Sequence, residues 1–300
     1  MIDMCMAIRY KHHMGRNYDY EQSYDETIIN IPRETYGNQY AIIGICAGIN
    51  PEYPLLYDGM NEHGLCCAAL AFTGNAKYNP MVDGKFNIPA YDFILETLGD
   101  FHNVKSVAKY LKEVNITDKA YDDRFPNTDL HWFICDRNMS LTVEATCNYK
   151  ETQKGTYVYE NRYDVLTNNP PFLLQAESYV KQNSLVGTYP FKDDKYRSRG
   201  TETYGLLGDT TSMSRFQRAR HYMKNMLDAN SPFNDTVETF HILGTAEQVY
   251  GATPVNSDYE YTIYKAAYDM DSLSLYVKRY DCLDVCEYDL DHEREWRCTI

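Results

Sequence analysis

The sequence predicts an α+β fold, because its strand and helix patterns come in blocks. Short β-branched apolar runs fill much of the first seventy residues, and two helical patterns follow them. Strands resume near residue 130, further helical patterns come next, and a last block of strands ends the chain. Such blocks are typical of layered α+β proteins, whereas regular alternation predicts βαβ units. No repeat, low-complexity tract or Pro/Gly/Ser-rich linker interrupts the chain, so we expect one domain over residues 1–300.

The first half contains a predicted hairpin and two predicted helices. Residues 40–49 are a short apolar run typical of a buried strand, and residues 55–59 and 65–72 flank a turn-like segment. We expect a helix from about 88 to 98, with Asn87 as its cap and Pro89 in its first turn. Apolar residues at helical spacing predict a second helix at 104–114.

The second half of the chain is predicted to contain strands, then helices, then strands again. Polar turns separate three runs that predict successive antiparallel strands, and later segments have helical patterns. The polar stretch 184–213 is long for a loop, which is typical of a functional or disordered segment. The predicted strands are 130–136, 141–147, 156–160 and several after 261, and the predicted helices are 170–183, 214–228 and 237–250.

Composition narrows the class of protein. The formal net charge is −14, and an acidic protein does not attract a polyanion electrostatically. We therefore expect no nucleic-acid partner. No run approaches the roughly 18 apolar residues that span a bilayer. The N-terminus lacks a basic start followed by an apolar segment, so we expect no secretory signal, no membrane association and a cytoplasmic location. The nine irregularly spaced cysteines are then mostly free thiols.

Several catalytic and metal-binding patterns are absent from the sequence. It contains no GxSxG, GxxxxGK[ST] or HExxH motif. The pairs Cys66–Cys67 and Cys282–Cys286 lack the second half of a zinc pattern, so we expect neither metal nor cofactor. His63 lies in a predicted turn, where a surface residue is a better interpretation than a general base.

Cys5 is the strongest candidate for chemistry. It precedes a predicted strand at residues 6–10 and follows Met4, whose removal would give Cys5 a free α-amino group. A thiol has a pKa near 8.5 and an α-amine near 8, so the amine can take the thiol proton and later deliver it to a leaving amine. A nearby arginine would favour the thiolate, and an aspartate would hold the amine. The alternative for Cys5 is a small buried residue at the start of a strand.

Nine motifs occur in order along the chain: MCMAIRY, GRNYDYE, IPRETY, YDGMNEHGL, NIPAYDFILETL, LHWFICD, VLTNNPPF, GLLGDTTSMSRFQRA and TFHIL. Together they make the chain similar to the choloylglycine hydrolase family, which comprises bile salt hydrolases and penicillin V acylases. This resemblance implies a four-layer αββα sandwich of the N-terminal-nucleophile type and hydrolysis of linear amides. It also implies a homotetramer, with residues 189–209 in the subunit contacts.

The resemblance also implies five catalytic residues. Cys5 matches the family nucleophile, and Arg16 and Asp19 match the pair beside it. Asn168 matches the oxyanion-stabilising side chain, and Arg215 matches the arginine that completes the polar cluster. Each of the last three has a structural alternative, since Asp19 could cap a turn, Asn168 could start a helix and Arg215 could be solvated.

The chain departs from the family pattern in two places. Residues 1–3 precede the usual Met-Cys start, so either Met4 is the true start or a leader is cleaved; otherwise the amine stays in a peptide bond and the mechanism fails. The family usually has asparagine or tyrosine where this chain has Ala71. The backbone N–H at position 71, which the resemblance directs at the oxyanion, is retained. We therefore expect activity with an altered substrate range.

The resemblance further implies a conjugated bile acid as substrate, with glycine or taurine as the amine. A sterol needs an apolar pocket, and we expect Met14, Tyr20, Phe72 and Phe133 to line it. Arg199 stands in a Ser-Arg-Gly sequence, which the family associates with taurine conjugates. This predicts a modest taurine preference, and the alternative is a mobile surface arginine.

Two other functions stay open at this point. One is a penicillin V acylase or N-acyl homoserine lactone acylase with the same five residues. The other is a catalytically silent family member that binds bile acids or acyl amides, which the alanine at position 71 keeps open.

Overall fold

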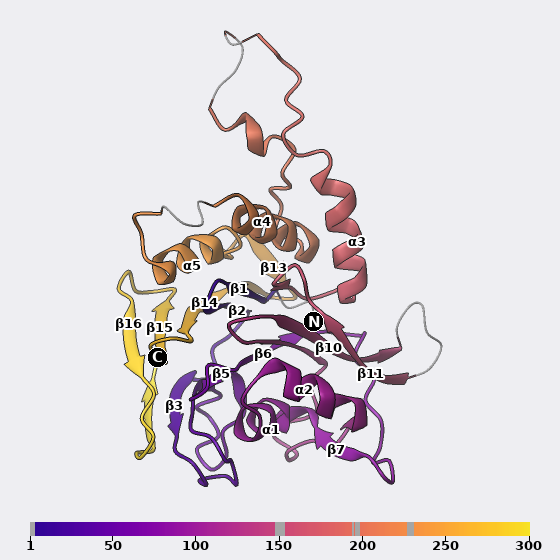
Figure 1. Cartoon of the computed structure of the whole chain (residues 1–300), viewed down its shortest axis with the longest axis vertical. Coiled ribbons are helices and arrows are strands. Elements are labelled where there is room, and N and C mark those ends of the chain that lie inside the picture. Colours follow the sequence, from indigo (N-terminus) through magenta and orange to yellow (C-terminus); the bar gives the residue numbers. More distant parts are fainter. Residues whose placement is uncertain (1–3, 148–153, 194, 196–198, 227–230) are drawn as a thin grey trace.

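Two large antiparallel sheets pack face to face, with helices on both outer faces (Figure 1). This computed structural model describes residues 4–147, 154–193, 195, 199–226 and 231–300. Helices α4 (Ser212–Asn225) and α5 (Asp235–Gly244) cover the first sheet, and α1 (Phe93–Asp100) and α2 (Val104–Tyr110) cover the second. The arrangement is the αββα sandwich that the resemblance implies.

The first sheet brings the N-terminal strands against the C-terminal half of the chain. Its order is β12-β1-β2-β14-β15-β16, with β13 paired to β14. The central strands are therefore β1, β2 and β14, and β14 follows β2 by about 240 residues in sequence. The bounds are β1 (Met6–Tyr10), β2 (His13–Tyr20), β12 (Val165–Leu166), β13 (Thr253–Val255), β14 (Asp258–Asp269), β15 (Ser274–Arg279) and β16 (Cys286–Asp289).

The second sheet follows the chain more closely. Its order is β11-β10-β9-β6-β5-β4-β3-β17, and a separate parallel pair joins β7 to β8. The bounds are β3 (Thr27–Ile31), β4 (Ile42–Cys46), β5 (Leu56–Asn61), β6 (Cys66–Ala71), β7 (Phe86–Pro89), β8 (Val114–Thr117), β9 (Leu130–Cys135), β10 (Ser140–Cys147), β11 (Lys154–Glu160) and β17 (Trp296–Thr299).

The core lies in two layers because both faces of the second sheet are covered. One apolar cluster fills the space between the sheets and under α4 and α5, and it includes Met6, Ile8 and Phe133. The other lies between the second sheet and α1, where the rings of Phe93 and Trp132 are 4.4 Å apart. Strands buried on both faces are apolar along their whole length, as in β4 and β6.

The structure confirms most predicted elements and corrects three helix ends. The hairpin forms as β5 and β6, and β9, β10 and β11 are successive antiparallel strands. The helix expected from residue 88 begins at Phe93, because the amide of Asn87 bonds to the backbone of Val82 and the preceding residues form β7. Helix α2 gives way to a 3-10 turn after Tyr110, and α5 ends at Gly244 rather than at 250.

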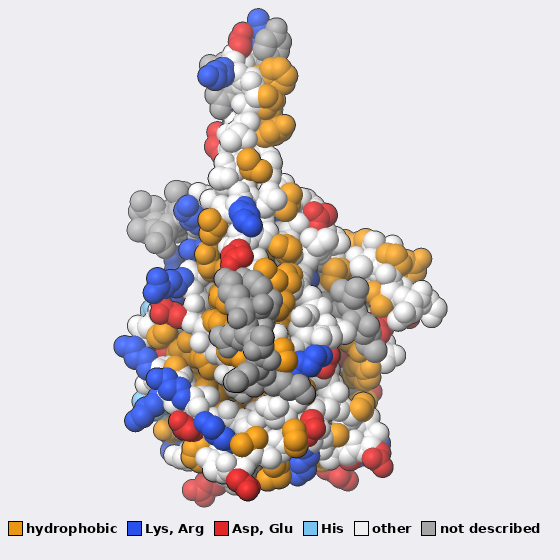
Figure 2. Space-filling view, turned by 90° about the vertical axis from the view of Figure 1, so that its right-hand side faces the viewer, with side chains coloured by type: hydrophobic (Ala, Val, Ile, Leu, Met, Phe, Trp, Pro, Cys, Tyr) orange, Lys and Arg blue, Asp and Glu red, His pale blue; other side chains and the backbone are white. Residues whose placement is uncertain are grey.

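A long segment projects from the body of the molecule after α3 (Phe172–Asn183) (Figure 1). It corresponds to the predicted polar stretch, and it contains a short 3-10 helix at Thr201–Thr203. Figure 2 shows hydrophobic side chains gathered along one side of this projection. Leu185, Phe191 and Tyr204 on it are exposed by about half.

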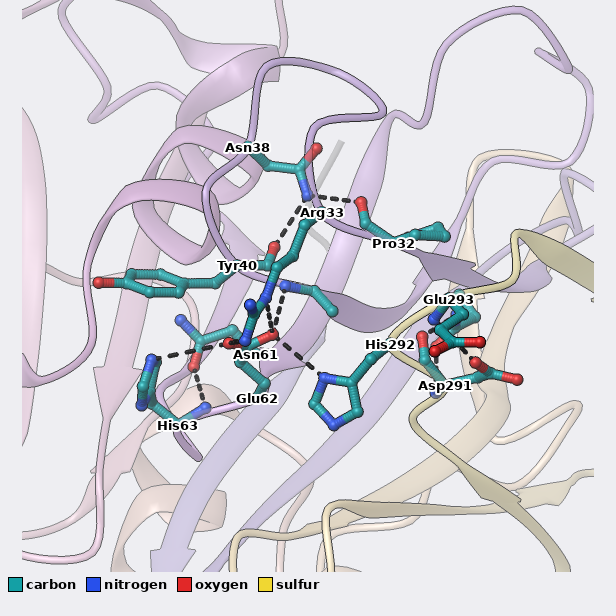
Figure 3. A network of polar contacts seen from close by, with 12 residues as sticks. Pro32, Arg33, Asn38, Tyr40, Asn61, Glu62, His63, Asp291, His292 and Glu293 are labelled. Atoms are coloured by element: carbon teal, nitrogen blue, oxygen red, sulfur yellow. Dashed lines mark hydrogen bonds and ion pairs between the residues drawn. The ribbon is translucent and has the colours of Figure 1, made fainter.

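A polar network around Glu62 ties the C-terminal segment to the second sheet (Figure 3). The Glu62 carboxylate accepts hydrogen bonds from two guanidinium nitrogens of Arg33 and from the backbone N–H of Ala41, 3.0 Å away. His292, near the C-terminus, places Nδ1 3.3 Å from the same carboxylate. The network therefore joins the β5–β6 turn to two other parts of the chain.

Candidate active site

Cys5 lies at the head of β1, between β2 and β12. Ala7 pairs with Arg16 of β2 on one side and with Leu166 of β12 on the other. Extending the second register by two residues brings Asn168 opposite Cys5. The side chain of Cys5 is buried, and its Sγ lies 3.7 Å from the backbone oxygen of Asp19.

Arg16 approaches from the space between the sheets. It lies on the opposite face of β2 from Asp19, because successive side chains alternate along a strand. Its Nη2 donates to the backbone oxygen of Ala69 at 2.6 Å, and its Nε is 3.6 Å from Oδ2 of Asp58. Burial lowers the pKa of Arg16, but the charges of Cys5, Tyr264 and Asp58 outweigh burial and raise it above the ordinary value.

Asp58 anchors this guanidinium from the second sheet. The hydroxyl groups of Tyr264 and Tyr268 both donate to its carboxylate, the first at 2.6 Å. Burial raises the pKa of Asp58, and Arg16 and the two tyrosines oppose that effect. Arg16 is thus held in a fully buried polar cluster, where its position is fixed by several partners.

Asp19 has one satisfied oxygen and one without a hydrogen bond. Its Oδ1 accepts from the hydroxyl of Thr262 at 2.6 Å, but no described residue donates to the buried Oδ2. Burial raises the pKa of Asp19 to about 7, although Arg215, Thr262 and Arg16 lower it. Buried polar atoms are normally hydrogen-bonded, so this oxygen can accept a bond from a further donor.

Because of a β-bulge, strand β14 places side chains on both sides of the site. The register against β2 shifts between Thr262 and Tyr264. In a regular strand these two side chains would share a face, yet Thr262 bonds to Asp19 and Tyr264 bonds to Asp58, between the sheets. The bulge thus supports both Asp19 and Arg16 from one strand.

Arg215 reaches the site from α4 and is fully buried. Its Nη1 donates to the backbone oxygen of Cys5 at 2.6 Å, and its Nη2 donates to Oδ1 of Asn168 at 3.0 Å. Burial lowers the pKa of Arg215, and the charges of Asp19, Cys5 and Glu260 partly offset this. The alternative of a solvated helix arginine is wrong.

Asn168 connects β1 to the end of β6. Because Arg215 fixes its carbonyl oxygen, its Nδ2 is directed at the backbone oxygen of Ala71, 3.0 Å away. An amide nitrogen carries two hydrogens, so one remains for another acceptor. The structure brings the two predicted oxyanion-stabilising positions together.

The predicted substrate-binding residues differ in how deeply their side chains are buried. Met14, Phe72 and Phe133 are fully buried, and the ring of Phe72 stacks on His131 at 4.3 Å. Tyr20 is partly buried and packs on the inner core, whereas Arg199 is exposed on the projection. The contact of all five with a substrate stays a prediction.

Sequence reasoning missed three supporting residues. Asp58 lies in the YDGMNEHGL motif, whose local pattern predicts no role for it, and Thr262 and Glu260 lie far from the predicted site residues in sequence. Glu260 is buried and accepts a hydrogen bond from the backbone N–H of Met4. The available signal was the pattern Glu-x-Thr on a buried strand, which puts two polar side chains on one face.

The assembled groups suit nucleophilic chemistry at sulfur. Two guanidinium groups beside a thiol favour its thiolate form, and Asp19 can hold a cation next to it. Among the described residues no cluster of three metal-ligating side chains is present, and none of their helices is long and apolar enough to cross a bilayer.

Comparisons with known proteins match the chain to one family of amide hydrolases. Residues 5–295 match the family described as linear amide C–N hydrolases, choloylglycine hydrolase family. The bile salt hydrolase/transferase of Lactiplantibacillus plantarum is 37% identical, over 97% of this chain and 93% of the relative. The enzyme of the same name from Clostridium perfringens is 33% identical, over 94% and 89%.

Solved structures extend the likeness to the fold. A variant of conjugated bile acid hydrolase from Clostridium perfringens superposes with a TM-score of 0.84 at 30% identity, covering 99% of this chain and 96% of the other. The penicillin V acylase of Agrobacterium tumefaciens has a TM-score of 0.71 at 18% identity, over 95% and 86%, and therefore shows the fold alone.

The family match begins at Cys5 and spans nearly the whole chain, so it includes every residue of the polar cluster. The chain belongs to the choloylglycine hydrolase family of linear amide C–N hydrolases.

Proposed function

We propose that this enzyme deconjugates bile salts with Cys5 as an N-terminal nucleophile, after Met4 and whatever precedes it have been removed. The observation that carries the proposal is the buried Oδ2 of Asp19, to which no described residue donates, in a residue whose backbone oxygen lies 3.7 Å from the Cys5 Sγ. The α-amine of an N-terminal Cys5 is a donor of the right charge in the right place. Its positive charge would also lower the raised pKa of Asp19.

The reaction follows from the positions of these groups. The α-amine takes the thiol proton, and Sγ attacks the amide carbonyl of the substrate. The oxyanion forms near the free N–H of Asn168 and the backbone N–H of residue 71. The amine product leaves with the proton, and water then hydrolyses the thioester and restores the thiol.

Cationic neighbours support the thiolate on two sides. Arg16 interacts with Cys5 from between the sheets, and Arg215 binds the carbonyl of Cys5 from the helical layer. Both guanidinium groups are fully buried, so water screens their charges little. The sulfur can therefore act as a nucleophile near neutral pH without a histidine.

The substrate assignment rests on relatives. Proteins named bile salt hydrolase/transferase and conjugated bile acid hydrolase match over 94–97% of this chain. We propose a modest preference for taurine over glycine conjugates, since the exposed Arg199 can pair with a sulfonate. Comparing taurocholate and glycocholate hydrolysis tests this, and equal rates that Arg199→Ala leaves unchanged would remove the idea.

The decisive variant is Cys5→Ala. We expect loss of at least about a thousandfold in kcat/KM, because no other group supplies the nucleophile, with an unchanged unfolding temperature. Cys147, an exposed thiol outside the site, provides the control variant Cys147→Ala, which should keep full activity. Bile salt hydrolysis by Cys5→Ala at the normal rate would refute the proposal.

Two alternative functions can be distinguished by measuring which substrates the protein turns over and which it only binds. Faster turnover of phenoxyacetyl amides or acyl homoserine lactones than of bile salts would make the chain an acylase with the same cysteine. Binding of bile acids without turnover, by a chain that retains Met4, would make it a silent binding member.

The assembly and location remain proposals of the same kind. We propose a homotetramer in which the projection carries subunit contacts, supported by its exposed Leu185, Phe191 and Tyr204. Light scattering should then give about four times the mass of one chain. A cytoplasmic location and a single domain stay predictions.

A further inference from the structure

His131 and Glu144 form a buried polar pair on the inner face of the second sheet, the face that also carries Phe133. Their side chains are at most 1% exposed, and Nδ1 of His131 lies 3.2 Å from Oε1 of Glu144. The two residues stand directly opposite each other on β9 and β10, where cross-strand side chains meet. Burying such groups is costly unless they are paired, and the reaction proposed for Cys5 gives neither of them a role.

Glu144 binds the turn that begins at Asn168. The oxygen that contacts His131 also accepts a hydrogen bond from the backbone N–H of Phe172, at 2.8 Å. Phe172 is the first residue of α3 and lies four residues after Asn168. Gln175 holds the other end of the turn, because its Nε2 donates to the backbone oxygen of Asn168. The turn is therefore fixed at both ends, and the carboxylate fixes one of them.

His131 supports the segment at the end of β6. Its ring stacks on the ring of Phe72, with centroids 4.3 Å apart and planes 8° from parallel. The contact of Nδ1 with Glu144 fixes the plane of the imidazole. Phe72 follows Ala71 directly, and the backbone oxygen of Ala71 accepts the hydrogen bond from Asn168. A fixed imidazole therefore limits how this segment can move.

The pair thus contacts the segments that carry both donors of the proposed oxyanion site. One donor is the side chain of Asn168, and the other is the backbone N–H of Ala71. The carboxylate reaches the first segment through the N–H of Phe172, and the imidazole reaches the second through the ring of Phe72. Oxyanion donors act because they are held in place before the charge develops, so a shift of either segment should slow the reaction.

A purely structural role is the alternative for this pair. A carboxylate near the N-terminus of a helix stabilises that helix, and Glu144 has this position at α3. No described residue bonds to Oε2 of Glu144 or to Nε2 of His131. The hydrogen bonds of the two side chains among the described residues therefore lie only between them and at Phe172. The two roles differ in what they predict for the rate of each folded molecule.

We propose that Glu144 and His131 are positioning residues, which together hold the two oxyanion donors at the distance that the oxyanion requires. This rests on the proposed function, in which an oxyanion forms when the thiol attacks an amide. Removing the carboxylate leaves two buried N–H groups without their acceptor, one on the imidazole and one at the start of α3. Both segments can then shift, and the transition state loses more stabilisation than the bound substrate does.

The test is a double-mutant cycle that combines Glu144→Ala with Asn168→Ala. Hydrolysis of taurocholate is measured per titrated active site, so that a loss of folded enzyme does not lower the rate. Glu62→Ala is the matched control, because Glu62 also accepts a hydrogen bond from a backbone N–H and contacts a histidine. Glu144→Gln keeps an acceptor oxygen and is the conservative variant.

We expect Glu144→Ala to lower kcat about tenfold with KM within about twofold, which is less than the roughly 10²-fold loss for deleting a donor outright. Glu144→Gln should recover most of this loss, and Glu62→Ala should leave kcat unchanged. When Asn168 is already alanine, Glu144→Ala should lower kcat by less than about threefold, because one of the donors that the pair positions is missing.

A loss of equal size with and without Asn168 would overturn the inference, and so would a Glu144→Ala variant with normal kcat and reduced stability. Glu144→Asp, which is shorter by one methylene, takes the place of Glu144→Ala in the cycle if the alanine variant does not fold. Either contradicting result leaves the role of Cys5 intact. Full activity of Cys5→Ala would instead refute the proposed function itself.

Discussion

Asp19 and Glu62 are two carboxylates with little exposure and opposite electrostatics. The side chain of Glu62 is 4% exposed, and donors from Arg33, Ala41 and His292 surround it. Its pKa is lowered because these donors outweigh burial. Asp19 is fully buried with one oxygen lacking a donor, and its pKa is raised to about 7.

The difference separates a structural carboxylate from a functional one. The hydrogen-bond and ion-pair partners of Glu62 all belong to the folded chain, so its charge stabilises contacts between distant segments (Figure 3). No described residue donates to the second carboxylate oxygen of Asp19 while Met4 is present. Perturbed pKa values gather at functional sites for this reason, and substituting both carboxylates should separate their roles.

The largest expected effect is on catalysis by Asp19→Asn. The amide cannot hold the α-ammonium by charge, so we expect kcat to fall by roughly 10²- to 10⁴-fold, the usual contribution of proton transfer. The unfolding temperature of the processed chain should also fall, because the buried α-ammonium loses its carboxylate partner. Steady-state kinetics and calorimetry on one preparation measure both, and activity within twofold of the native enzyme would contradict the assignment.

Asn168→Ala tests the oxyanion site next. Loss of its side-chain N–H should lower kcat by about 10²- to 10³-fold, as for other oxyanion donors. Asn169→Ala is the matched control, because the Nδ2 of Asn169 donates to the backbone of Thr73 rather than toward Cys5. Similar losses in the two variants would mean that the segment is merely deformed.

The pH dependence of stability should depend on Met4. With Met4 present, the pKa of Asp19 is above its unfolded value, so its contribution to stability falls as pH rises from about 4 to about 7. An α-ammonium lowers that pKa and reduces this loss. Thermal unfolding at pH 5 and pH 8, on chains with and without Met4 by intact mass, should show the larger loss with Met4, and equal losses would contradict this.

The smallest effect on catalysis should come from Glu62→Gln. The fold should lose about 1–2 kcal/mol, since one hydrogen-bonded charge is replaced, with kcat within twofold. Denaturant unfolding at pH 7 measures the loss. A large fall in kcat at unchanged stability would mean that this network serves the active site.

Local patterns predicted the elements that depend on neighbours in sequence. The β5–β6 hairpin and helix α4 follow from apolar spacing and turn residues. The start of α1 was wrong, because Asn87 bonds to the Val82 backbone instead of capping a helix. A local pattern cannot tell these two uses of an asparagine apart.

The site was predictable only in part. The motifs identified Cys5, Arg16 and Asp19, and the structure brings these residues together. Glu260 was missed because its place depends on β14 pairing with β2 some 240 residues away. Asp58 was missed because its contact with Arg16 crosses between sheets, which no single segment records.

The identity of the N-terminal residue of the active enzyme decides whether the α-amine of Cys5 is free to take part in catalysis. Intact mass and the rate of bile salt hydrolysis should be measured on the same purified protein. We expect the active chain to begin at Cys5, and the fraction of chains beginning there to equal the fraction of active sites titrated. A preparation that hydrolyses bile salts at full rate with Met4 still bonded to Cys5 would contradict it.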